Sequence, residues 1–167
     1  MDILGVIKSI ASQVQSVKSG VGYADIVLSV DNFGDSIIFP VVPAELPQLE
    51  TPQKNENFEG VLIDLTVIGN LACKRIQWEG LLPSSPSKYP FCRPNGDTAD
   101  RVINFIKRYQ AEFTPLRLTI SFTNGVVYTN MLCLVNNFKS HRDNVGDYHY
   151  NIELIEYRDV GTGGVYL

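Results

Sequence analysis

The side chains best suited to chemistry gather near the C-terminal end of the sequence. His141 and His149 are the two histidines of the chain, and Asp143 and Asp147 lie between them. Imidazole and carboxylate groups at such short spacing can bind zinc or another transition metal. Turns between strands also collect Asp, Asn and Gly, because these residues bond to nearby backbone groups or accept positive φ angles. We interpret the cluster as a polar turn over 141–147, and we expect no metal site and no cofactor.

Three cysteines are the other candidates for chemistry. Cys73, Cys92 and Cys133 could pair with a histidine as a nucleophile, although nothing in their spacing favours this. Cys73 and Cys133 lie in apolar, strand-like sequence, which is typical of small core residues. An odd number of cysteines without a Cys-x-x-Cys pair predicts no disulfide framework and a reducing, intracellular site of synthesis. We do not expect the protein to be an enzyme, and a small hydrolase with a Cys-His site remains the alternative.

Alternation of apolar and polar residues predicts that β-strands dominate the chain. Between the second and third strands, prolines and polar residues predict a loop over 45–57. The pair Asn124-Gly125 separates two alternating segments and is preferred for a type I′ hairpin turn. Because strands follow one another along the chain, we expect antiparallel pairing. The predicted strands cover 26–30, 36–42, 58–68, 73–82, 116–122, 127–135 and 148–154.

Two segments have the three-to-four-residue apolar spacing of amphipathic helices. The first covers 1–17 and ends before Gly20 and Gly22. The second begins at Asp97 or Thr98, either of which can cap it. The first helix has three open interpretations: it packs on its own domain, docks as an arm on a neighbouring subunit, or lies on a membrane surface. Few basic residues on its polar face disfavour the membrane.

Length and composition indicate one globular domain. The chain has 167 residues, of which 44% are hydrophobic and 19% are charged, as in ordinary folded proteins. Together with the predicted elements, this indicates a mainly β (α+β) fold, an antiparallel β-barrel or sandwich with one flanking helix. We divide the chain into a helical arm at 1–20, a β domain at 21–160 and a flexible tail at 161–167.

The charge balance excludes some classes of partner. Lys and Arg number 14 against 18 Asp and Glu, for a net charge of -4. A mildly acidic chain has no field that would concentrate nucleic acid, so we expect no sequence-specific nucleic-acid binding.

No apolar run reaches the roughly 18 residues that a membrane span needs, and no basic region opens a signal peptide.

Three blocks of sequence resemble, in order, the motifs of one family. The first, at 37–46, reads I-I-F-P-V-V-P-A-E-L. The second runs from Ile68-Gly69 through Arg75-Ile76 to Tyr89-Pro90-Phe91. The third runs over 105–118 and closes at 146–158 with G-D-Y-H-Y-N-I-E-L-I-E-Y-R, the most distinctive pattern. Over about residues 35–160 the chain thus resembles the N-terminal domain of the XkdP-like, LysM-bearing baseplate proteins of contractile phage tails.

The resemblance implies a structural role in the virion. Such proteins resemble tail-tube proteins, a β-barrel with one flanking helix, and form a ring that joins the central hub to the tail tube. The implied partners are copies of the chain itself, the tail tube protein and the baseplate hub protein, with wedge and tape-measure proteins left open. The implied location is the tail baseplate, after synthesis in the host bacterial cytoplasm. The family usually continues into a LysM domain, which we do not expect here because the sequence stops at Leu167, soon after Arg158.

Candidate contact residues lie in two places. We expect the subunit contacts to come from the apolar face of the N-terminal arm and from the loop between Glu45 and Asn57. The arm residues are Ile3, Ile7, Ile10 and Val14. The alternative function is a carbohydrate- or cell-surface-binding β domain of a phage particle, which Trp78 and the tyrosines would serve. Because Trp78 alternates with Ile76, we interpret it as a core residue instead.

Overall fold

The computed structural model describes residues 23–30 and 34–159 of the chain. The predicted N-terminal helix with its four contact residues and the predicted tail lie outside the described residues. Within them, the helix α2 covers Ala99–Ala111. The strands are β1 (Ala24–Val30), β2 (Asp35–Ile38), β3 (Leu49–Glu50), β4 (Glu56–Phe58), β5 (Leu65–Val67), β6 (Arg75–Leu82), β7 (Leu116–Phe122), β8 (Val127–Arg142) and β9 (Tyr148–Glu156).

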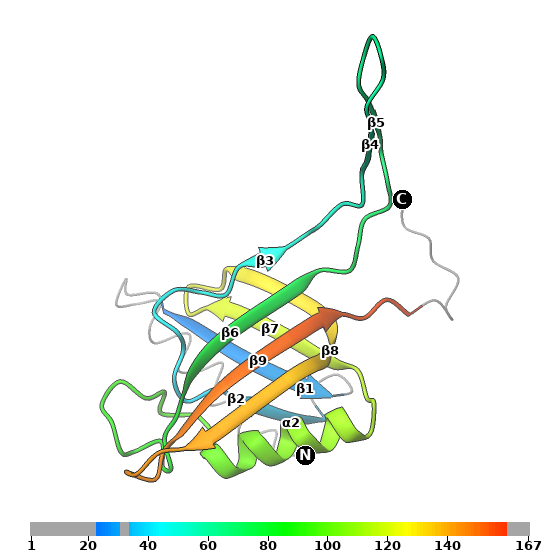
Figure 1. Cartoon of the computed structure of the whole chain (residues 1–167). Coiled ribbons are helices and arrows are strands. Elements are labelled where there is room, and N and C mark those ends of the chain that lie inside the picture. The colour runs from blue at the N-terminus through cyan, green and yellow to red at the C-terminus, as the bar shows by residue number, and fades with distance from the viewer. Residues whose placement is uncertain (1–22, 31–33, 160–167) are drawn as a thin grey trace.

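Seven of these strands form one sheet in the order β2-β1-β7-β8-β9-β6-β3, with every neighbouring pair antiparallel. The strands β4 and β5 pair only with each other. Figure 1 shows them as a narrow hairpin that projects away from the sheet. The mainly β class with an antiparallel sheet and a helix is confirmed. The predicted barrel or sandwich is not seen, because β2 and β3 are the two ends of an open sheet in the described residues.

One continuous core lies between the sheet and α2. Alternate residues of the strands point into it, as the period of two requires. Phe39 is at its centre, with ring centroids 5.6 Å from both Trp78 and Tyr150. The indole Nε1 of Trp78 donates a hydrogen bond of 2.9 Å to the hydroxyl of Tyr150, so neither buried polar group is left unsatisfied. The prediction that Trp78 is a core residue is confirmed.

The helix α2 begins where the sequence predicts. Thr98 is its N-cap, and the Thr98 Oγ1 accepts from the backbone N–H of Arg101 at 3.4 Å. Asp97, the other predicted cap, instead accepts from the backbone N–H of Ile38 on β2. The helix packs on β2 and β8 and lies along the lower side of the sheet in Figure 1. Its buried stripe is Ala99, Val102, Ile103, Phe105, Ile106 and Tyr109.

The cap makes a testable contribution to stability. We expect Thr98→Ala to lower the free energy of unfolding by about 1 kcal/mol, because the hydroxyl that satisfies a free N–H of the first turn is lost. Urea unfolding followed by circular dichroism measures this loss. Thr98→Ser keeps the hydroxyl and serves as the control. A Thr98→Ser variant as unstable as Thr98→Ala would show that the cap hydrogen bond is not the cause.

Two details of the strands differ from the prediction. At Asn124-Gly125 only Gly125 has a positive φ, of 87°, so the predicted type I′ turn is wrong. Gly125 N–H bonds to the carbonyl of Phe122, as in a type I turn followed by a left-handed residue. The strand predicted at 127–135 continues to Arg142, because a bulge between Val135 and Asn137 bends it without ending its pairing with β9.

Candidate interaction surface

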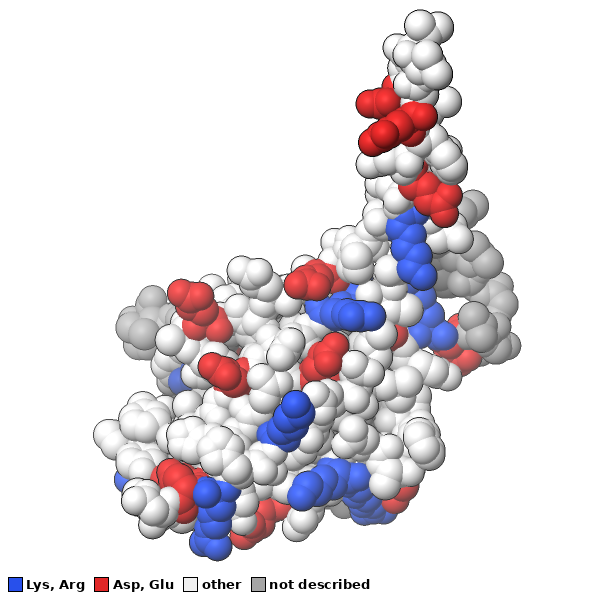
Figure 2. All heavy atoms as spheres, in the orientation of Figure 1, with Lys and Arg blue, Asp and Glu red and all other residues white. Residues whose placement is uncertain are grey.

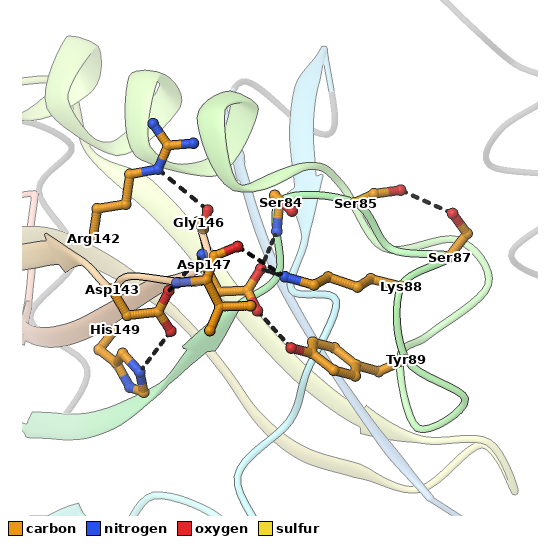
Figure 3. A network of polar contacts seen from close by, with 11 residues as sticks. Ser84, Ser85, Ser87, Lys88, Tyr89, Arg142, Asp143, Gly146, Asp147 and His149 are labelled. Carbon is orange, nitrogen blue, oxygen red and sulfur yellow. Dashed lines mark hydrogen bonds and ion pairs between the residues drawn. The ribbon is translucent and has the colours of Figure 1, made fainter.

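The predicted turn beside the histidines holds a closed polar network rather than an open ligand set. Asp147 is buried, and its side chain is 2% exposed. It accepts from the Lys88 Nζ at 2.8 Å, the Ser84 N–H at 2.9 Å and the Tyr89 hydroxyl at 2.7 Å. Figure 3 shows these three groups converging on Asp147 from the loop after β6. The network therefore fastens the 83–89 loop to the turn between β8 and β9.

The same network sets the acidity of its carboxyl groups. The Lys88 ammonium, the Ser84 N–H and the Tyr89 hydroxyl together hold the pKa of Asp147 far below its usual range. Burial opposes ionisation of Asp143, but backbone N–H groups of the turn outweigh it and lower the pKa of that carboxyl too. The hydrogen bond from Tyr89 to Asp147 raises the pKa of the phenol.

The two histidines make few contacts with the polar network of this turn. The Nε2 of His149 lies 3.5 Å from the Asp143 Oδ2, and the His141 and His149 rings stack with centroids 5.3 Å apart. In the part of the chain that the structure describes, no group of three or more His, Cys, Asp or Glu side chains is placed to hold a metal ion. Asp143 and Asp147 instead accept hydrogen bonds from the protein itself.

The three cysteines are free thiols, and of them Cys133 alone is buried. Cys133 is fully buried in β8, and burial raises the pKa of its thiol to about 12, which makes it a poor nucleophile. Its prediction as a core residue is confirmed. Cys73 is only half-buried and precedes β6, so its prediction as a core residue is wrong.

The most exposed apolar surface is the hairpin of β4 and β5, where the sequence predicted a single strand at 58–68. That strand prediction is wrong because the chain reverses between Phe58 and Leu65, which pair with each other. A side chain at Gly60 would collide with the carbonyl oxygen of Ile63, so the reversal requires glycine there. The sequence signal that was missed is Glu59-Gly60, followed by the three consecutive apolar residues 61–63.

We define the hairpin arm as residues 53–71. Hydrogen bonds close its base: the Lys54 N–H bonds to the Asn70 carbonyl, and the Gly69 N–H bonds to the Asn55 side chain. Its tip has no comparable support, and Val61 and Leu62 are 103% and 94% exposed. The exposed large apolar residues of the arm are Phe58, Val61, Leu62, Ile63, Leu65, Val67, Ile68 and Leu71. Monomeric proteins rarely expose so continuous an apolar patch.

Negative charge accompanies this apolar surface. Glu56, Glu59 and Asp64 are the charged residues between 55 and 71, a stretch without Lys or Arg. Figure 2 shows these acidic side chains along the arm and an uncharged tip above them. An isolated two-stranded hairpin is marginally stable in water, so the arm gains stability wherever a partner covers it.

The contact loop predicted between Glu45 and Asn57 contains β3 and the start of β4. Glu45 is exposed and lines a groove of about 750 Å³ beside β6. Leu49–Glu50 forms β3 and pairs with the start of β6. Asn57 lies on β4, where its side-chain oxygen accepts from the Thr66 hydroxyl at 3.0 Å. The two predicted contact residues are thus separated, and Asn57 belongs to the arm.

The two ends of the sheet differ in how far their outer strand is covered. At one end β2 pairs only with β1. Its outward groups are bonded to the protein itself, because Ile38 exchanges hydrogen bonds with Asp97 and the Ser36 carbonyl accepts from Arg101. At the other end, Gln77 to Leu82 of β6 extend beyond the two residues of β3. Such an edge presents alternate N–H and C=O groups that can pair with another chain.

Comparison with known proteins adds no assignment: no protein-family model and no curated protein matches this sequence. Among the described residues, no helix has both the length and the apolar character needed to cross a membrane. The resemblance to baseplate proteins therefore depends on the residues quoted above.

The third of those blocks contacts each of the other two in space. The Tyr89 hydroxyl of the second block donates to Asp147 of the third, and Phe39 of the first stacks on Tyr150 of the third. The quoted residues of the three blocks are thus joined by direct contacts in the folded chain.

Because the tip is exposed, its apolar residues are expected to tolerate polar substitutions with little loss of stability. We expect replacing Val61, Leu62 and Ile63 together by serine to change the free energy of unfolding by no more than about 0.5 kcal/mol, because none of them contacts the core. The same variant is expected to elute earlier from a hydrophobic-interaction column. Urea unfolding and column retention give the two readouts. A loss of several kcal/mol would mean that the arm folds back on the body.

Proposed function

We propose that the chain is a structural subunit of a contractile phage tail baseplate, forming a ring that joins the central hub to the tail tube. The observation that carries this proposal is the hairpin arm. The body already buries a complete core, whereas the arm leaves eight large apolar side chains in solvent. A protein gains from such a segment only when another chain covers it, and the ordered resemblance to baseplate proteins gives the class of assembly.

The sheet supplies the second feature that a ring subunit needs. Gln77 to Leu82 of β6 form a strand edge that β3 leaves uncovered at one end of the sheet. Pairing this edge with a different surface of the next copy is a heterologous contact, which closes into a ring when the rotation per subunit divides a full turn.

The proposed mechanism is mechanical and not enzymatic. Subunits hold one another through strand pairing and buried apolar surface, and transmit the movement of the tube when the sheath contracts. The net charge of -4 suits a channel through which DNA slides without binding. Neighbouring proteins in this proposal are the tail tube protein and the hub protein.

The carbohydrate-binding alternative loses its main support. It depended on Trp78 and the tyrosines, but Trp78 is 5% exposed and its indole N–H is already bonded to Tyr150. We therefore propose no second function.

Cryo-electron microscopy of particles purified from the producing strain tests the proposal, with mass spectrometry to establish that the chain is present. We expect density for the chain in a ring between hub and tube. Its absence from the particles, or a position on peripheral fibres, would overturn the proposal.

A further inference from the structure

We propose that Asn124 is a site of spontaneous covalent modification, at which attack by the backbone nitrogen of Gly125 converts the side-chain amide to aspartate or isoaspartate. The chain has two Asn-Gly pairs, Asn95-Gly96 and Asn124-Gly125, and both asparagines are exposed. The structure distinguishes the two pairs, because the second lies in a turn that can open by itself and the first does not. This inference is independent of the proposed function.

The reaction consumes water and releases ammonia, with no change of oxidation state. The Gly125 nitrogen bonds to the Asn124 Cγ and gives up its proton, while the bond from Cγ to the side-chain nitrogen breaks and that nitrogen leaves as ammonia. The product is a cyclic succinimide. Water then opens the ring at one of its two carbonyl carbons, which gives aspartate or, where the chain continues through the former side chain, isoaspartate.

The carboxamide of Asn124 is already turned towards the backbone that follows it. Its Oδ1 accepts from the Val126 N–H at 3.1 Å. This N–H donates to the oxygen on which negative charge develops when Cγ is attacked, as in an oxyanion hole. Glycine adds no steric barrier, since a Cβ built on Gly125 would have no atom within 4 Å.

Two hydrogen bonds of short range close the turn. The Phe122 N–H bonds to the Val126 carbonyl at 2.7 Å, and the Gly125 N–H bonds to the Phe122 carbonyl at 2.9 Å. The second must break before the Gly125 nitrogen can attack. Because both join residues no more than four positions apart at the end of a hairpin, the turn can open by local fluctuation without unfolding of the sheet.

The other pair is held against β2 and the residues that follow it. Gly96 packs so closely there that a Cβ built on it would lie 2.5 Å from the Pro40 Cα. The Arg93 N–H bonds to the Pro40 carbonyl at 2.7 Å, and the Asp97 N–H bonds to the Ile38 carbonyl at 2.9 Å. The backbone on both sides of this pair must separate from β2 before it can rearrange, so we expect it to react slowly.

Conversion changes the surface at the end of the β7–β8 hairpin. It adds one carboxylate, which takes the net charge of the chain from -4 to -5. Isoaspartate also inserts a methylene group into the backbone, which lengthens the turn and disturbs the bond between Phe122 and Val126. The exposed side chains of Val126, Val127 and Tyr128 follow directly. The protein thus gains with age a negative charge beside an exposed apolar surface.

Peptide mapping by mass spectrometry tests this inference on the purified full chain, incubated at a mildly alkaline pH for increasing times. We expect aspartate and isoaspartate to accumulate at Asn124 at least about tenfold faster than at Asn95, which corresponds to a difference of roughly 1.4 kcal/mol between the two barriers. In urea, where the fold is lost, we expect the two rates to converge, because both asparagines precede glycine.

Two variants separate the sites. Asn124→Gln keeps an amide but would have to form a larger ring, so its elution from an anion-exchange column is expected to stay constant while the wild type elutes later with time. Asn95→Gln is the matched control and is expected to shift as the wild type does. Equal rates at the two asparagines of the folded chain, faster conversion at Asn95, or an unmodified Asn124 under conditions where the chain in urea reacts would each overturn the inference. None of these results bears on the proposed place of the chain in a ring.

Discussion

Replacing Phe39 by alanine is expected to lower the free energy of unfolding by roughly 3–5 kcal/mol. Phe39 is fully buried, and its ring packs edge-on against Trp78 and stacks with Tyr150. Removing it leaves a cavity beside Trp78 and Tyr150, and the hydrogen bond between these two residues loses the ring that packs against both. Since small domains are stable by about 5–15 kcal/mol, this loss is a large share of the total.

Urea unfolding with fluorescence of the single tryptophan measures the loss, because Trp78 lies directly against the cavity. Phe113→Ala is the matched control, since it removes the same side chain from a position that is 86% exposed. We expect the control to cost no more than about 0.5 kcal/mol. Equal losses in the two variants would contradict the placement of Phe39 at the centre of the core.

The body of the fold could be predicted because its signals are local. Alternation in β1 and β9 and the Thr98 cap of α2 each specify an element within a few residues. These local signals agree with the burial that the structure shows. Sheet order could not be predicted in the same way, because the pairing of β6 with β9 joins residues 66 to 80 positions apart, from Leu82 with Tyr148 to Arg75 with Ile155. Whether the sheet closes is likewise decided by tertiary packing.

The hairpin arm could not be predicted from the alternation of apolar and polar residues. The alternation is present, but the apolar residues face solvent and not a core. Val61, Ile63 and Leu65 alternate like residues that face a core, so periodicity predicts burial. In the structure they stand in solvent. A run of apolar residues indicates a surface that is stabilised by burial. It does not indicate whether the same chain or another chain buries that surface.

The sequence predicts the polar turn over 141–147, but it does not predict which residues elsewhere in the chain bond to it. Asp143 and Asp147 lie in a turn, as expected, and the Asp143 side chain accepts from the backbone N–H groups of Val145 and Asp147, which are close in sequence. The Lys88 and Tyr89 groups that hold Asp147 come from 58 or 59 positions earlier in the chain. Spacing along the sequence cannot reveal such a contact, so the sequence alone is also compatible with a metal site there.

Replacing Asp147 by asparagine is expected to lower the melting temperature by several degrees at neutral pH. The substitution keeps the shape of the side chain but removes the charge that Lys88 faces at 2.8 Å. It also turns one acceptor oxygen into a donor beside groups that are themselves donors, so one hydrogen bond of the network is lost. The loop at 83–89 then loses its main link to the turn between β8 and β9.

The pH dependence of this effect follows from the lowered pKa of Asp147. A carboxyl group that is more acidic in the folded state stabilises that state above its unfolded pKa, near 3.8, and loses this contribution as the pH falls below it. The gap in melting temperature between wild type and Asp147→Asn is therefore expected to be widest above about pH 5 and to narrow towards about pH 2.5. Differential scanning calorimetry across this range measures the gap. Asp64→Asn, which removes the same charge from the exposed arm, is expected to show a small gap throughout. A gap for Asp147→Asn that does not change with pH would mean that the shape of the side chain, and not its charge, fastens the loop.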